Sequence, residues 1–139
     1  MPKKRVVPRP TDAELEILNV LWQRGAATVR EVHDELSARK PTVYTTVLKT
    51  LQIMTEKGLV ERDESQRAHL YRARLAQDET QRQLLNDLLA RAFDGSATKL
   101  VMQALSAKEA SAEELTEIRA LLDRLERGHV AGNEEGEER

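Results

Sequence analysis

Residues 41–58, PTVYTTVLKTLQIMTEKG, decide how this chain folds. The stretch is rich in β-branched residues, which favour strands, but its apolar residues do not alternate as a half-buried strand requires. They recur instead with the period of a helix, at Val43, Val47, Leu51 and Met54. Because proline suits the first turn of a helix and glycine its C-terminal stop, we predict a helix with Pro41 in its first turn that ends before Gly58.

The opposite face of this predicted helix carries short hydroxyl and polar side chains, at Thr42, Thr45, Thr46, Lys49 and Gln52. A helix fits the major groove of B-DNA, where threonine can bond phosphates or base edges and its methyl can contact that of thymine. Lys40 and Lys49 can pair with phosphates. The alternative is a solvated face that is rich in threonine by chance, but such faces more often carry Glu–Lys pairs. The pattern therefore favours a DNA-reading helix.

Two shorter helices are predicted before it, and each begins with a capping box. In the first box Thr11 caps Glu14, and in the second Thr28 caps Glu31. Gly25 ends the first helix at about residue 24, and the second stops near residue 37 or 38. The apolar residues of the two helices recur at helical spacing, at Leu15, Leu18, Leu21 and Trp22 and then at Val29, Val32 and Leu36.

After Gly58 the pattern changes to two short strands, residues 59–64 and 69–75, joined by a tip at residues 65–68. Their inward residues are expected to be Leu59, Leu70 and Tyr71. Arg67 lies at the tip and His69 follows it, which suits a wing along the DNA backbone or minor groove; an ordinary polar turn is the alternative. Three helices followed by a hairpin predict a winged helix-turn-helix DNA-binding domain over residues 11–75, with His33 as a solvated helix residue.

Residues 76–127 return to helical periodicity and are predicted to form a dimerisation domain. A helix is expected over residues 77–93, a short one near residues 100–105, and a last one that Ser111 starts with a third capping box. The apolar stripes contain Leu84, Leu85, Leu88, Leu89, Leu115, Ile118, Leu122 and Leu125. In the alternative, these stripes fold back on the winged domain and give a monomer. Residues 128–139 are acidic and contain glycine, so we expect a disordered tail.

Charge is distributed unevenly along the 139 residues. The net charge is −2, yet residues 1–74 carry 14 Lys and Arg against 10 Asp and Glu, and residues 75–139 carry 8 against 14. The first half suits an anionic polymer, and the second half should lie away from one. Residues 1–10 are predicted to be a flexible basic arm that attracts phosphates through Lys3, Lys4, Arg5 and Arg9.

Composition excludes several classes of function. There is no cysteine, so disulfides and cysteine-based metal sites are absent, and no long apolar run predicts a membrane span or a secretory signal. Aromatic residues make up 3%, too few for a platform that stacks single-stranded bases. His33, His69 and His129 share no metal-ligand spacing, and there is no phosphate loop or nucleophile elbow. We therefore expect a cytoplasmic protein without catalysis, cofactor or metal.

Three separated segments resemble the BlaI/MecI penicillinase-repressor family in order and spacing. They are TVYTTVLKTLQIMTEKGLVERDESQRAHLYRA from residue 42, TDAELEILNVLW from residue 11, and GSATKLVMQAL from residue 95 followed by SAEELTEIRALLDRLE. The resemblance covers about residues 10–127. It implies a winged-helix repressor that binds a palindromic double-stranded DNA operator as a homodimer and silences genes next to its own.

The resemblance also implies how repression ends. In the family, a membrane metallopeptidase sensor triggers cleavage of the repressor in its dimerisation region. This chain carries Gln103 and Ala104 where the family has its Asn-Phe cleavage pair, a departure that leaves the cleavage site open. Copper-responsive relatives carry a cysteine-rich motif that this chain lacks.

Two other classes stay as alternatives. A winged helix can serve as a protein–protein interaction module, although the basic threonine face and the arm disfavour this. A MarR-like regulator would need a small-molecule pocket, for which the short C-terminal region and the few aromatic residues leave little room.

Overall fold

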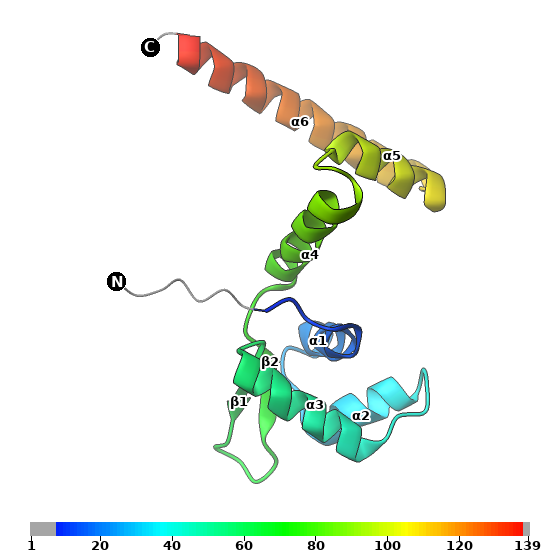
Figure 1. Ribbon diagram of the computed structural model, residues 1–139, viewed down its shortest axis with the longest axis vertical. Coiled ribbons are helices and arrows are strands. Elements are labelled where there is room, and N and C mark those ends of the chain that lie inside the picture. Colours follow the sequence, from blue (N-terminus) through cyan, green and yellow to red (C-terminus); the bar gives the residue numbers. More distant parts are fainter. Residues whose placement is uncertain (1–7, 138–139) are drawn as a thin grey trace. The chain divides into compact units, whose positions relative to one another are not determined.

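The computed structural model describes residues 8–137, and the side chains of residues 8–129. Within that range the chain forms six helices and one antiparallel two-stranded sheet (Figure 1). The elements follow the order α1 (Asp12–Arg24), α2 (Val29–Ser37), α3 (Tyr44–Lys57), β1 (Val60–Asp63), β2 (Leu70–Ala73), α4 (Gln77–Ala92), α5 (Ala97–Ala107) and α6 (Ala112–Glu137). This confirms the predicted mainly helical fold with a small β-hairpin. The chain divides into two compact units, the first ending at Leu88 and the second beginning at Leu89.

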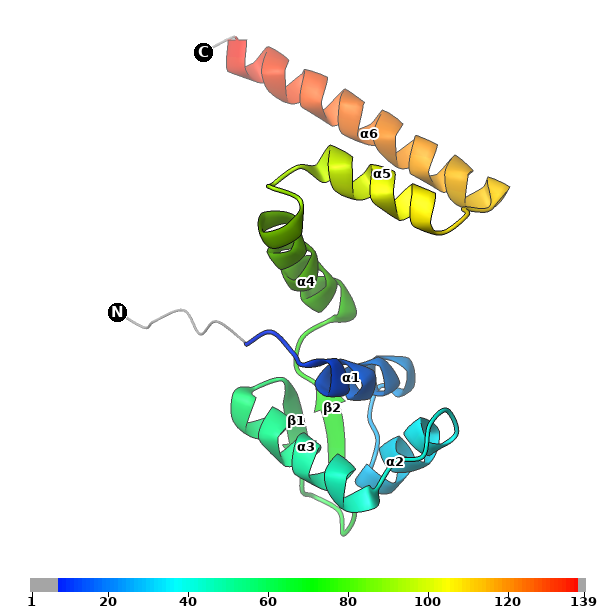
Figure 2. The same cartoon turned by 45° about the vertical axis from the view of Figure 1, so that its right-hand side comes forward.

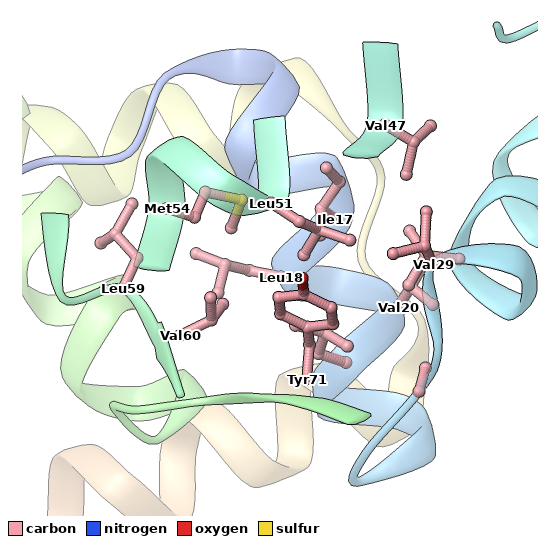
Figure 3. Packing of buried hydrophobic residues seen from close by; sticks show 13 residues of the cluster. Ile17, Leu18, Val20, Val29, Val47, Leu51, Met54, Leu59, Val60 and Tyr71 are labelled. Carbon is pink, nitrogen blue, oxygen red and sulfur yellow. The ribbon is translucent and has the colours of Figure 1, made fainter. Parts of the chain in front are cut away.

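The first unit has one hydrophobic core, built by α1, α2, α3 and the hairpin (Figure 3). Every residue in it is at most 8% exposed: Ile17, Leu18, Val20, Leu21, Ala27, Val29, Val32, Val47, Leu51, Met54, Leu59, Val60 and Tyr71. Leu15 and Trp22, which recur at helical spacing with Leu18 and Leu21, are only partly buried. The Trp22 indole instead donates to the Leu75 carbonyl at 3.0 Å, which ties α1 to the segment before α4.

All three predicted capping boxes are present. The side chains of Thr11, Thr28 and Ser111 accept from backbone amides three residues on, and the matching glutamates accept in return. Gly58 closes α3 in the left-handed conformation, with φ 82°. Because these local bonds satisfy the free amides at helix starts, the sequence alone places the starts of α1, α2 and α6.

The hairpin pairs Val60 with Ala73 and Asp63 with Leu70. A third segment joins it, because Ala27 and Tyr71 exchange both backbone hydrogen bonds, at 3.0 and 2.8 Å. This link fixes the hairpin against the connection between α1 and α2. A single bridging residue carries no periodic pattern, so this pairing could not be predicted from the sequence.

Helix α3 begins later than the sequence predicts. Its N-cap is Val43, in an extended conformation with φ −85° and ψ 131° and without a side-chain cap, so Pro41 precedes the helix instead of starting it. An extended residue does not share the face of the helix that follows. Val43 is therefore 64% exposed, and its predicted place on the buried stripe is wrong.

The sequence predicts that the winged domain ends at residue 75 and that a dimerisation domain begins at residue 76. The first unit continues to Leu88, and Thr80 of α4 is 3% exposed. In the second unit no side chain from residue 89 to residue 129 is buried. Helix α6 continues to Glu137, whereas the sequence predicts disorder from Gly128. A glycine inside a helix costs only about 1 kcal/mol relative to alanine, so glycine alone is a weak stop signal.

Among the described residues, none of the helices has the length and apolarity needed to cross a membrane.

Candidate DNA-binding surface

The exposed face of α3 is the predicted polar face. Its central stripe, Val47, Leu51 and Met54, is at most 2% exposed. On the other side, a shallow hollow of ≈390 Å³ is lined by Thr45, Thr46, Leu48, Lys49 and Gln52. Apart from the partly buried Leu48, these side chains are exposed. The helix therefore presents hydroxyl, amide and ammonium groups on a surface free to meet a ligand.

Thr42 does not lie on that face of α3. It belongs to the turn before the helix, where its hydroxyl donates to the Lys40 carbonyl at 2.8 Å. Both residues line a smaller hollow of ≈90 Å³ that also involves Arg39. Thr42 is half-buried, and Lys40 is exposed. The structure thus separates Thr42 from the polar face of α3 to which the helical period assigned it, and places it with Lys40 in the turn before the helix.

His33 holds the same turn in place. Its Nε2 lies 2.9 Å from the Thr42 carbonyl oxygen and its Nδ1 lies 3.0 Å from Asp34 Oδ1. The ring also meets Tyr44 edge-on, with centroids 5.7 Å apart. With its side chain only 19% exposed, His33 is not the solvated helix residue that the sequence predicts. His33 connects α2 to the start of α3. This contact spans the turn between the helices, so no local sequence pattern predicts it.

A partly buried ion pair holds the other end of α3. Lys57 Nζ lies 2.9 and 3.1 Å from the two carboxylate oxygens of Glu14, which is 3% exposed. Burial raises the pKa of Glu14, but the hydrogen bond from the Thr11 amide and the charge of Lys57 outweigh it, so the pKa lies below its ordinary value. The sequence identified Glu14 only as a capping residue, and no local pattern showed that Lys57 would face it.

The wing brings Arg67 and His69 to an exposed loop between β1 and β2. These two residues line a hollow together with the starts of α2 and α3. Arg30 of α2 lies in the same hollow, and its guanidinium sits 5.2 Å from the centroid of the Tyr44 ring. Arg30 was not among the predicted site residues, because nothing local to α2 shows that the wing approaches it.

The predicted arm is largely outside the described residues, which include neither Lys3, Lys4 nor Arg5. Arg9, which is described, forms an ion pair with Asp87 of α4. Of the predicted dimerisation residues, Leu84, Leu89 and Ile118 are half-buried, and the exposed ones are Leu85, Leu88, Leu115, Leu122 and Leu125. Gln103 and Ala104 are exposed on α5.

Three helices, a wing and an exposed polar recognition face define a winged helix-turn-helix DNA-binding protein. The sequence model of the family described as "Penicillinase repressor" matches residues 10–124. The chain belongs to the penicillinase repressor family, as the resemblance of its three segments predicted. It is accordingly a DNA-binding transcriptional repressor, and its family is not one of enzymes.

Individual relatives align with this chain over most of their length. The chain is 36% identical to the transcriptional regulator BlaI of Mycobacterium tuberculosis over 119 residues, which cover 85% of this chain and 86% of that protein. It is 25% identical to the penicillinase repressor of Bacillus licheniformis over 117 residues, or 84% and 91% of the two chains. The solved structure of RosR from H. salinarum aligns with a TM-score of 0.50 over 88% of this chain and 99% of that one. At 18% identity, this last likeness concerns the fold alone.

Proposed function

We propose that this protein represses transcription as a homodimer that places α3 of each subunit in the major groove of a palindromic operator. The observation that carries the proposal is the two-sided character of α3. One side is buried in the core and fixes the helix, and the other exposes Thr45, Thr46, Lys49 and Gln52. A helix held rigidly from behind, with short polar side chains in front, is suited to reading base edges.

The proposed contacts divide by chemistry. Thr45 and Thr46 read base edges or thymine methyls, because they lie on the exposed face of α3. Lys49 pairs with a phosphate from the exposed face of α3, and Lys40 and Thr42 contact the backbone or the groove edge from the turn before the helix. In the wing, Arg67 and His69 lie against phosphates or the minor groove. The basic side chains Lys3, Lys4 and Arg5 add sequence-independent attraction by releasing counterions.

Dimerisation is proposed for the helices from α4 to α6. They expose Leu85, Leu88, Leu115, Leu122 and Leu125, each at least 38% accessible. Burying one such leucine contributes about 1.5–3 kcal/mol, so several of them can hold two subunits together in water. The remaining stripe residues, Leu84, Leu89 and Ile118, would complete the interface. Two recognition helices double the DNA contacts and set the spacing of the operator half-sites.

Release of the operator is proposed to follow proteolysis triggered by a membrane metallopeptidase sensor. The position of Gln103 and Ala104 supports access, because both are exposed. Both also lie within the helix α5. A protease binds its substrate extended, so cleavage here requires local unwinding of α5. Since its proposed ligand is operator DNA, we propose that the repressor acts in the cytoplasm.

The test compares Thr46→Ala with Lys49→Ala on the duplex upstream of the protein's own gene and on a scrambled duplex. Because Thr46 is proposed to read a base, its variant should weaken binding to the first duplex more than to the second. The Lys49 variant should weaken both and lower the salt slope by roughly one. Equal losses on the two duplexes for Thr46→Ala would contradict a base contact.

A further inference from the structure

A hollow of ≈260 Å³ lies where the start of α2, the start of α3 and the loop of the wing meet; we call it the α2–wing hollow. Figure 2 shows that loop and the beginning of α3 on the same lower side of the first unit. Three basic side chains line the hollow: Arg30, Arg67 and His69. They come from two elements more than thirty positions apart in the sequence, so only the tertiary fold assembles them.

The charges in this hollow are all of one sign. None of the residues that line it carries a carboxylate. Glu31 follows Arg30 in the chain and does not line the hollow; its carboxylate accepts from the Thr28 amide and forms an ion pair with Arg24. Guanidinium groups that share a hollow without a carboxylate repel each other, and an anion between them removes that repulsion.

The geometry favours a phosphate as this anion. The Arg30 guanidinium lies 5.2 Å from the centroid of the Tyr44 ring, and Tyr44 in turn contacts His33 edge-on. A guanidinium held over an aromatic ring loses less freedom on binding, and its planar fork can donate to two oxygens of one phosphate.

We propose that the α2–wing hollow binds one phosphate of the DNA backbone, with Arg30 as the principal ligand and Arg67 and His69 closing over it from the wing. This inference rests on the proposed function, since it takes duplex DNA as the ligand. Tyr44, which supports Arg30, opens α3, and two of the next residues, Thr45 and Thr46, lie on the exposed face. A phosphate bound here therefore flanks the groove that α3 enters and sets the position of the helix.

The experiment measures binding of full-length Arg30→Gln to the upstream duplex across a range of salt concentrations. We expect affinity to fall roughly tenfold or more, as for the loss of a charged hydrogen bond. The slope of log K against log salt should decrease by about one. Arg30→Lys, which keeps the charge but loses the planar fork, should keep the slope and recover only part of the affinity. Arg82→Gln, at an exposed arginine of α4 outside the hollow, is the matched control and should change neither.

A second measurement locates the contact. Single phosphates of the duplex are replaced by uncharged methylphosphonates, and one position should weaken wild type but leave Arg30→Gln unaffected. A normal salt slope for Arg30→Gln, or equal sensitivity of both proteins at every position, would overturn the proposal. Saturable binding of inorganic phosphate at matched ionic strength, with DNA binding unchanged in Arg30→Gln, would also overturn it by assigning the hollow to a free anion.

The outcome for Arg30 is separable from the outcome for the operator. A backbone contact does not depend on base sequence, so the change in slope should also appear on a scrambled duplex. If wild type bound the upstream and the scrambled duplex equally well, the proposed operator recognition would be contradicted. The proposed phosphate contact of Arg30 would not be affected by that result. The melting temperature of each variant shows whether it is folded.

Discussion

The winged domain and the helices that follow it contain similar apolar stripes, but the stripes are buried in the first and exposed or half-buried in the second. In the first unit, three helices and a hairpin converge, and apolar residues such as Leu51 and Val32 are 0% exposed. In the second, the apolar stripe of α6 is just as regular, yet no side chain between residues 89 and 129 is buried. An apolar stripe is stable in water only when another surface covers it, and in the winged domain other elements of the same chain cover it. For the C-terminal helices, we propose that a second chain covers it.

The largest effect expected from this comparison is on the stability of the winged domain. Leu51→Ala leaves a cavity in a closed core and should lower the free energy of unfolding by about 2–5 kcal/mol. Leu122→Ala, at a residue that is 55% exposed, should change the unfolding of dilute protein by less than about 0.5 kcal/mol. Urea denaturation followed by the fluorescence of Trp22, the single tryptophan, measures both. Similar losses in the two variants would mean that α6 folds back on the winged core.

The second prediction places a charge in the proposed interface. Leu122→Asp should dissociate the dimer, because a carboxylate cannot be buried unpaired against leucines. Sedimentation at micromolar concentration, with wild type alongside, gives the mass of each. Operator affinity should fall with dissociation, and the Trp22 melting curve of the winged domain should stay the same. Wild type that sediments as a monomer and still binds a palindromic operator fully would refute the dimer.

The third prediction concerns the ion pair that holds the end of α3. Glu14→Gln keeps a side chain that suits the capping box but removes the charge facing Lys57. We expect a loss of about 1–3 kcal/mol at neutral pH. Because the pKa of Glu14 is lowered in the folded state, its stabilisation is present above the unfolded pKa and is lost as pH falls through the folded value.

The difference between wild type and Glu14→Gln should therefore shrink below about pH 4. Denaturation at a series of pH values measures it. Glu16→Gln, at an exposed residue of the same helix, is the control and should have little effect at any pH. A difference that does not change with pH would assign the loss to packing instead of charge.

The smallest expected effect tests the corrected start of α3. Val47→Ala, at a residue 2% exposed, should cost about 1.5 kcal/mol from two lost methyl groups. Val43→Ala, at a residue 64% exposed, should cost no more than about 0.5 kcal/mol. Urea midpoints of the two variants compare them directly. A larger loss for Val43→Ala would restore it to the buried stripe that the helical period predicts.

Local patterns in the sequence were sufficient for most of the elements. The capping boxes that begin at Thr11, Thr28 and Ser111 marked three helix starts, and Gly58 marked the end of α3. The same period placed Thr45, Thr46 and Lys49 opposite the buried stripe. It failed at Val43, because a residue in extended backbone does not follow the helical period. The prediction that order ends at Gly128 also failed, because glycine disfavours a helix without forbidding one.

The sequence by itself determined the helices, the hairpin, the family and the polar face of α3, since each depends on residues a few positions apart. Only the tertiary structure decided that His33 holds the turn at Thr42 and that Glu14 meets Lys57. It also brought Arg30 beside Arg67. The first two pairs are separated by 9 and 43 positions in the sequence. Arg30 and Arg67 are separated by 37 positions. Periodicity describes one element at a time, whereas such contacts depend on how the core packs several elements together.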